Sequence, residues 1–509
     1  MKKYIIFAGA LLIAPQIWSQ ELEPTDAIRF GSNQLNGSAR YNAMSGAFGA
    51  IGGDVSAIQD NAAGSAVFNY NNVSFGANIS SRKNNASFLN YNSTEKNTAL
   101  DFSHFGAVFV VDGKEDSKIK NYNFGLIINN QATYDNNYRI QGINNQSIGN
   151  YFLQHANFGD NGSPVPLDLV QTMQGETIGD LYDFLNSQPN GFQAQQAMMG
   201  YQGYILNDEP NGSYSLNVAP GKYYQETLMN TSGFNSKLTG NFGLNIDNKY
   251  YLGANLNVSF IDFNKSISTF EENTAPVTSG VGTIFFDNNI YTYGSGFSFN
   301  IGGIAKLTES TRVGLSYESP TWYGLNDESQ QRLQTYSYDN GVRSMHDVNP
   351  NLVTLFDRYR IKTPSTFGAS FAYIFGKSGI ISVDYKIKDF STTKYSSDTS
   401  NFSDLNNYYS NNLKSSSEVR IGGEYRISQV SLRAGYRYVQ SPYKQTNIIG
   451  DVNSVSGGIG YSFGAARLDF GYSYTHQPMS MNVISSGLDD YATVKTKHNN
   501  FSLTYSFSF

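Results

Sequence analysis

The C-terminal segment Phe501-Ser502-Leu503-Thr504-Tyr505-Ser506-Phe507-Ser508-Phe509 decides the fold class. Its apolar side chains alternate with hydroxylated ones. Because successive side chains of a β-strand point to opposite faces, this period of two predicts a strand with one apolar and one polar face.

The same alternation recurs upstream, with charged residues on the face opposite the aromatic ones. Ile381, Val383, Tyr385 and Ile387, for example, alternate with Asp384, Lys386 and Lys388. A soluble sandwich would bury the aromatic face, and a membrane barrel would turn it toward lipid, so the alternation alone leaves both architectures open. Further runs of this kind lie at 419–427, 432–438 and 468–474.

Connection lengths separate the two architectures, because tight turns alternate strictly with long connections between the predicted strands. Outer-membrane barrels have short periplasmic turns, long outer loops and an even strand number. We therefore predict an all-β protein, a transmembrane antiparallel β-barrel of about 14 strands over residues 71–509. The predicted strands are 71–82, 100–112, 119–131, 234–246, 250–263, 294–308, 311–322, 363–376, 379–391, 416–428, 430–440, 452–463, 465–477 and 495–509. The long connections are 83–99, 132–233, 264–293, 323–362, 392–415, 441–451 and 478–494.

Composition excludes several functional classes. The 509 residues contain no cysteine, which excludes a disulfide framework and a thiolate metal site. A net charge of −6 without a basic cluster argues against nucleic-acid binding. The five histidines are scattered, and no nucleophile elbow, phosphate loop or dinucleotide motif is present, so we predict no enzymatic activity, no metal and no cofactor.

The N-terminal region has two parts. Residues 1–19, with a basic start and a short apolar run, predict a signal peptide. Residues 20–70 are rich in glycine and small residues, which permit close backbone packing, and they predict a compact plug.

The plug sequence carries a family resemblance. Ala39–Ala57, followed by Asn61-Ala62-Ala63-Gly64, resembles the N-terminal hatch of FadL/TodX-type outer-membrane transporters of hydrophobic compounds, in particular the branch found in the Bacteroidetes. Thr363–Ala369 and Glu418–Tyr443 resemble later strands of that family. The family's hatch usually has Asn-Pro-Ala where this chain has Asn61-Ala62-Ala63, and without the proline the turn is less rigid.

The resemblance implies a function and several partners. It implies a 14-stranded barrel plugged by the hatch, located in the bacterial outer membrane, and passive uptake of long-chain fatty acids or other hydrophobic small molecules. Asn61, Ala62, Ala63 and Gly64 would then form the plug or gate, and a kink in the third strand, near Gly125, would open the wall sideways. The expected partners are a hydrophobic ligand, outer-membrane lipid and, through Phe509, the outer-membrane assembly machinery.

The longest outer loop, 132–233, is the expected capture surface. It contains a stretch with helical spacing around 178–185 and a second apolar stretch at 192–201. Either these side chains contact ligand or the helices only pack on one another and close the barrel mouth. The candidate ligand-binding residues are Ile178, Leu181, Phe184, Leu185, Phe192, Met198, Met199 and Tyr201.

Other interpretations concern the lumen and the outer loops. Charged residues on the lumen side of the strands, among them Asp384, Lys386, Arg420, Glu424 and Arg433, are expected to form ion pairs that hold the plug. One alternative function is a general porin, which would need neither a plug nor an apolar loop. Another is a barrel that serves as a docking or shuttle module of a protein secretion system.

Overall fold

The computed structural model describes residues 24–158, 162–188 and 190–509. The predicted signal peptide, 1–19, lies outside the described residues, as do residues 20–23 of the predicted plug. None of the described helices is long and apolar enough to cross a membrane.

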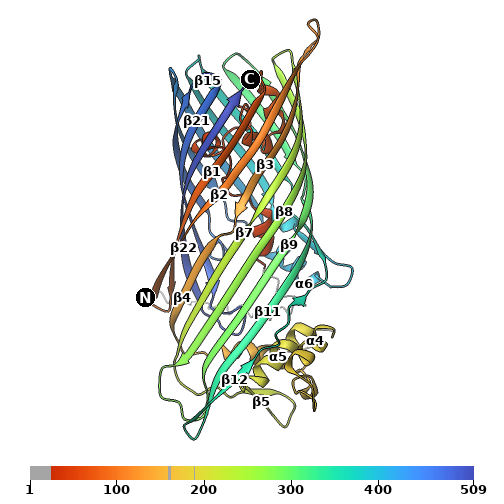
Figure 1. Cartoon of the computed structure of the whole chain (residues 1–509), viewed down its shortest axis with the longest axis vertical. Coiled ribbons are helices and arrows are strands. Elements are labelled where there is room, and N and C mark those ends of the chain that lie inside the picture. Colours follow the sequence, from red (N-terminus) through yellow and green to blue (C-terminus); the bar gives the residue numbers. More distant parts are fainter. Residues whose placement is uncertain (1–23, 159–161, 189) are drawn as a thin grey trace, which may run out of the picture.

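Within the described residues, fourteen antiparallel strands close into one barrel (Figure 1), as predicted. The first strand pairs with the last from Asn72↔Ser508 to Ser87↔Thr493, which leaves the sheet without an edge. Three of the fourteen are interrupted and carry two labels each. In barrel order the strands are β1 (Asn72–Phe88), β2 (Tyr91–Asp112), β3 (Ile119–Thr133) with β4 (Asn136–Asn144), β7 (Tyr223–Ile246), β8 (Tyr250–Asn273), β9 (Gly280–Lys306), β10 (Thr311–Glu318) with β11 (Trp322–Asp339), β15 (Thr366–Phe375) with β14 (Tyr359–Lys362), β16 (Gly379–Asp389), β18 (Ser415–Ile427), β19 (Val430–Val439), β20 (Val452–Ser462), β21 (Ala466–Asn482) and β22 (Tyr491–Ser508).

The apolar face of these strands points outward. Phe501, Leu503 and Tyr505 are exposed, whereas Ser502 and Thr504 between them are buried against the lumen contents. A soluble sandwich would show the reverse, so the orientation of the two faces selects the membrane barrel.

Several predicted long loops are in fact strand. Residues 83–99 continue β1 and β2 up to a tight turn at Leu89 and Asn90, both with positive φ. Residues 264–293 and 323–362 are likewise mostly strand. The reason is that these segments rise beyond the lipid, so their outward positions are largely polar, while apolar residues such as Phe88, Ile284 and Leu333 point inward and pack on the loop helices. The outward apolar period of the membrane strands is therefore absent.

The barrel is much taller on one side than on the other (Figure 1). β7, β8 and β9 have 24, 24 and 27 residues, whereas β18, β19 and β20 have 13, 10 and 11. Helices from the long loop fill the end of the tall side. They are α3 (Gly149–Asn157), η4 (Leu167–Leu169), α4 (Ile178–Asn186) and α5 (Gly191–Gln202), with the small hairpin β5 (Leu206–Asp208) and β6 (Tyr214–Leu216).

The low side is completed by short elements. α6 (Ser403–Asn412) and η5 (Phe390–Thr392) lie beside β17 (Lys394–Ser396), which pairs with β14. On the tall side, β12 (Val342–Val348) and β13 (Thr354–Leu355) pair with β11.

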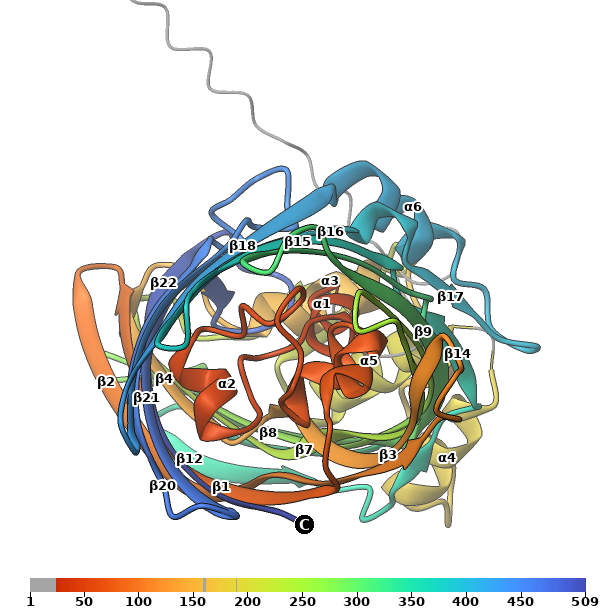
Figure 2. The ribbon, with the colours of Figure 1, turned by 90° about the horizontal axis from the view of Figure 1, so that it is seen from above.

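Residues 24–71 lie inside the barrel (Figure 2). They form α1 (Asp26–Gly31), α2 (Ala39–Ala43), η1 (Ser56–Gln59) and η2 (Ala62–Val67). Wall glycines let this segment approach closely: a Cβ on Gly253 would stand 2.2 Å from Ala62 O, and one on Gly314 would stand 2.4 Å from Gly49 O. We call residues 24–71 the plug.

Candidate functional site

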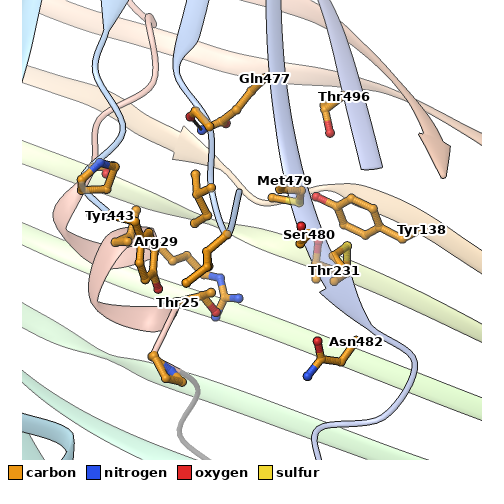
Figure 3. Close-up of a pocket in the computed structure, with 18 of the residues that line it drawn as sticks. Thr25, Arg29, Tyr138, Thr231, Tyr443, Gln477, Met479, Ser480, Asn482 and Thr496 are labelled. Carbon is orange, nitrogen blue, oxygen red and sulfur yellow. Dashed lines mark hydrogen bonds between the residues drawn. The ribbon is translucent and has the colours of Figure 1, made fainter. Parts of the chain in front are cut away.

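A cavity of about 2020 Å³ lies between the plug and the helices of the long loop. Figure 3 shows residues from α1, β4, β7 and β21 around it. Typical small-molecule pockets hold roughly 300–1,000 Å³, so the space admits a ligand larger than a drug-sized molecule.

The cavity lining includes flexible and apolar side chains beside many polar ones. Three methionines contribute, Met229 from β7 and Met479 and Met481 from β21. Methionine adapts to ligands of different shape because it is unbranched and polarizable. Other apolar lining residues are Leu153, Phe192, Ile267, Phe286, Ile448 and Ile484.

Arg82 of β1 brings a positive charge to this space. Its guanidinium is buried, with 6% exposure, and donates to Gln34 Oε1 at 2.9 Å and to the Asp135 carbonyl at 2.5 Å. Among the described residues no carboxylate forms an ion pair with it. A buried cation that has only neutral acceptors can gain a charge-assisted hydrogen bond from an anionic group in the cavity.

The register of the strands places Arg82 near the methionines. Arg82 pairs with His498 of β22, and Thr496 lies two residues before His498 on the same strand. On the neighbouring β21, Met479 pairs with Val494, which lies two residues before Thr496. Thr496, His498 and Tyr138 also line the cavity. The cation and the apolar lining therefore belong to one continuous surface.

The plug is tied to the low wall by buried ion pairs, as predicted. Asp60 accepts from Tyr41 Oη at 2.5 Å, from Arg420 Nη1 at 2.7 Å and from Lys386 Nζ. Burial by itself would raise the pKa of Asp60, but the Arg420 and Lys386 charges outweigh it and hold the pKa at about 2. Glu418 in turn binds Arg420 at 2.6 Å and Arg437 at 2.5 Å.

A second network ties α2 to the same wall. Glu424 of β18 binds Arg40 of the plug at 2.8 Å and Arg433 of β19 at 2.7 Å. Arg433 also binds Asp469 at 2.9 Å. Breaking a buried pair costs about 3–5 kcal/mol, so these contacts hold the plug firmly against β16–β21.

The predicted ligand-binding residues of the long loop are mostly in the core of the helical cap. Leu181, Leu185, Met198 and Met199 are buried in a cluster with residues of β9 and β11, and Ile178 and Tyr201 pack against it. Phe184 points to solvent, with 49% exposure. Phe192 alone of the eight lines the cavity. The expectation of a shared ligand-contact surface is therefore corrected for the other seven, because their helical stripe packs on neighbouring helices.

The predicted gate residues form the start of η2. Asn61 caps this helix by accepting from the Ala63 N–H, and its Nδ2 donates to Gly49 O at 2.7 Å. Ala62, Ala63 and Gly64 are buried against β7, β8 and β9. They join the plug to the tall wall, and their role in gating stays a prediction.

The predicted opening at Gly125 is wrong in position. Gly125 is paired on both sides, with Val108 of β2 and Asn241 of β7, so the ladder is unbroken there. The register instead shifts between Asn130 and Ala132, and the strand is interrupted at residues 134–135. Pairing of β2 with β3 ends at His104↔Asn129, and in the described ladders residues 91–103 of β2 pair only with β1.

The model of the family "Outer membrane protein transport protein (OMPP1/FadL/TodX)" matches residues 223–509, more than half of the chain. The chain belongs to this family. A model of the uncharacterised family UPF0164 matches residues 14–152. No curated protein matches the sequence.

Solved structures share the fold of this FadL/TodX-family protein. A FadL homologue of Pseudomonas aeruginosa is 12% identical with a TM-score of 0.55, and the match covers 94% of this chain and 100% of that chain. The toluene transporter TodX of Pseudomonas putida is 14% identical with a TM-score of 0.51, covering 94% and 100%. At this identity the likeness shows the barrel fold alone.

Family and fold together establish the location and the class of the protein. FadL/TodX-family proteins are outer-membrane transport proteins, and this member has the closed barrel, so the predicted bacterial outer-membrane location is confirmed. The family is one of transporters and not of enzymes. The described residues contain no group of three side chains suited to hold a metal ion.

Sequence reasoning missed the main cavity residues of this FadL/TodX-family protein. Arg82 is the last residue of the predicted strand 71–82, and the alternation offers a usable signal, because Arg82 and Ser80 fall on the face opposite apolar Ile79. Met479 and Met481 belong to β21, whereas the sequence pattern predicts a loop over 478–494. The cavity joins residues from distant strands, which no local pattern brings together.

Proposed function

We propose that the protein takes up hydrophobic small molecules passively through the outer membrane, and that long-chain fatty acids are its ligands. The observation that carries this proposal is the cavity, which combines apolar lining residues, three methionines among them, with the cation of Arg82, whose hydrogen-bond acceptors are neutral. A fatty acid has the matching parts, an apolar chain and a carboxylate.

The plug supports uptake of a ligand rather than free diffusion of solutes. Residues 24–71 cross the lumen and bind both the low wall, through Asp60 and Glu424, and the tall wall, through η2. A general porin needs an open water channel. No specific contact favours a docking module for secreted proteins.

The interruption of the third strand supports a sideways exit. β3 ends at Thr133 and β4 starts at Asn136, while residues 91–103 of β2 lack a backbone partner on that side. Side chains instead of backbone groups connect β2 with β4; Asn97 Nδ2, for example, donates to Asn137 Oδ1 at 3.4 Å. Such contacts separate more easily than a backbone ladder, so we propose that the ligand leaves sideways at the end of β3 (130–133), beside residues 100–103 of β2.

Uptake of a labelled long-chain fatty acid into liposomes tests the function. Purified protein should give saturable uptake, and Met229→Trp, which puts a larger and more rigid side chain into the cavity, should slow it by about tenfold. Met345→Trp is the matched control, because Met345 is exposed on β12 and does not line the cavity. Folded protein that neither binds nor transports the fatty acid would contradict the proposal.

A further inference from the structure

The outward side chains mark the edge of the lipid on the barrel. Going outward along β7, exposed Phe234 is followed by Ser232 and Asn230, and along β8 Phe260 is followed by Asp262. On β22 the outward side chains change from apolar to polar between Phe501 and Asn499. Because a membrane barrel carries its apolar side chains only where it meets hydrocarbon, these positions set the outer boundary of the membrane.

The two sides of the barrel rise to different heights above this boundary. Residues 223–233 of β7 lie beyond it and, at about 3.3 Å per residue and about 40° tilt, reach roughly 28 Å above the hydrocarbon. On the low side β18 begins at Ser415 and β19 ends at Val439, only about four residues, or roughly 10 Å, beyond the apolar residues Val419 and Tyr436. The low rim therefore lies at the level of the lipid head groups.

The cap closes the axial end of the tall side. α4 and α5 pack into one buried cluster with Leu333 of β11 and Val348 of β12, and Met198 and Leu185 are fully buried in it. α4 contributes no residue to the cavity lining. A direct axial path would have to displace this core.

The cavity lining reaches the surface on the low side, and at the end of α3 exposed Phe158 also lines it. The lining on the low side includes Gln445 and Asn447, which follow β19, and Asn412 of α6. Gln154 of α3 and Ser485 line the same cavity. Gln445, Asn447 and Ser485 are exposed, so the same cavity that contains Arg82 is bounded here by surface residues.

The chemistry of this part of the lining suits an amphiphile. These residues carry amide and hydroxyl groups, while Leu153, Ile448 and Met481 line the same cavity. A ligand that stands at the lipid surface would meet polar groups first and an apolar lining behind them.

We propose that this low-side mouth is the entrance of the transporter, and that it receives amphipathic molecules sideways from the surface of the outer leaflet rather than axially from the medium. The inference rests on the proposed function, since an entrance has meaning only if the cavity carries a ligand. The physical driving force is partition: amphiphiles concentrate at the lipid surface, and the low rim lies at that level.

Two single-cysteine variants of the full-length protein test the entrance, because the chain has no cysteine of its own. Asn447→Cys lies at the mouth, and Asn186→Cys is the matched control at the exposed end of α4. Modification with a bulky maleimide-polyethylene glycol should slow fatty-acid uptake on the order of tenfold at position 447 and leave it unchanged at 186. Equal rates for both adducts, or a block at 186 only, would overturn the inference.

A second measurement is independent of transport. A fluorophore attached at position 447 should be quenched several-fold more by lipids with a nitroxide on the head group than one attached at 186. Equal quenching would overturn the location of the mouth at the lipid surface. If unmodified protein takes up no fatty acid although the quenching differs as expected, the proposed ligand fails while the position of the mouth stands.

Discussion

At the residue scale, Arg82 determines which ligands the cavity should prefer. Replacing it with methionine removes the cation and keeps an apolar side chain of similar length. A hydrogen bond to a charged group contributes about 1.5–3 kcal/mol, so Arg82→Met should weaken fatty-acid binding by about 10- to 150-fold. The methyl ester of the same acid should bind wild type and variant equally.

Fluorescence titration with both ligands measures this effect. Lys497→Met is the control, because Lys497 lies on β22 and points outward. Since Arg82 also donates to Gln34 and to the Asp135 carbonyl, a general distortion would weaken both ligands alike, and that result would remove the role of Arg82 in head-group recognition.

His155 makes the cap sensitive to acid. Its ring packs on Tyr151 and Phe192, with centroids 4.6 and 5.6 Å apart, and burial lowers its pKa from 6.5 to about 4. Between about pH 4 and pH 6.5, the His155 imidazole binds a proton in the opened cap but not in the packed cap. Cap stability should therefore be constant above pH 6.5 and fall as the pH decreases toward 4.

Hydrogen exchange of α3 at pH 7.5 and pH 5, corrected for the intrinsic rate, measures this dependence. His155→Gln should lose the part of this dependence that comes from the imidazole. A remaining part is expected from Glu271, which accepts from the Ile148 N–H at the start of α3 and whose pKa burial raises to about 7. A wild-type protein without any pH dependence would show that the ring is not held in the packed state.

At the element scale, α4 has a structural role. Leu185 is fully buried in the cap and Phe184, its neighbour, is exposed. Leu185→Ala should destabilise the cap by about 2–5 kcal/mol, whereas Phe184→Ala should change it by less than about 0.5 kcal/mol. Limited proteolysis of the loop 132–233 compares the two variants.

The same two variants show whether α4 only packs in the cap or also contacts the ligand. Because neither residue lines the cavity, fatty-acid affinity should be unchanged in Phe184→Ala. A large loss of affinity in that variant, with the cap intact, would restore α4 as a capture surface.

At the scale of the whole molecule, the path of the ligand can be tested by locking the plug. The hydroxyl groups of Ser45 in the plug and Ser456 in β20 are 2.8 Å apart. The double variant Ser45→Cys, Ser456→Cys should form a disulfide without large rearrangement. If the ligand leaves sideways at the end of β3, uptake by the oxidised protein should stay within about twofold of the reduced protein.

Each single-cysteine variant serves as the control for the oxidant. Uptake that stops on oxidation and returns on reduction would show that the plug itself has to move, and would exclude the sideways exit as the sole path.

The sequence by itself determined the class of the fold and its location. Period-2 alternation in segments such as 501–509 and the even number of strands predicted the barrel, because side-chain direction in a strand depends only on local backbone geometry. The charged lumen residues Arg420 and Glu424 were likewise identified from their register, and the structure confirms that they bind the plug.

Only the tertiary structure decided the height of the wall, the position of the strand interruption and the composition of the cavity. Strand extensions above the lipid, such as 83–88, turn polar side chains outward and apolar ones, such as Ala86 and Phe88, inward, so they lack the outward apolar period of the membrane strands. The helical stripe of α4 was equally consistent with core and with ligand contact until its neighbours were known. Arg82, Met229 and Met479 come from three strands far apart in the chain, and only barrel closure places them around one space, because strand pairing over such separations is a long-range property.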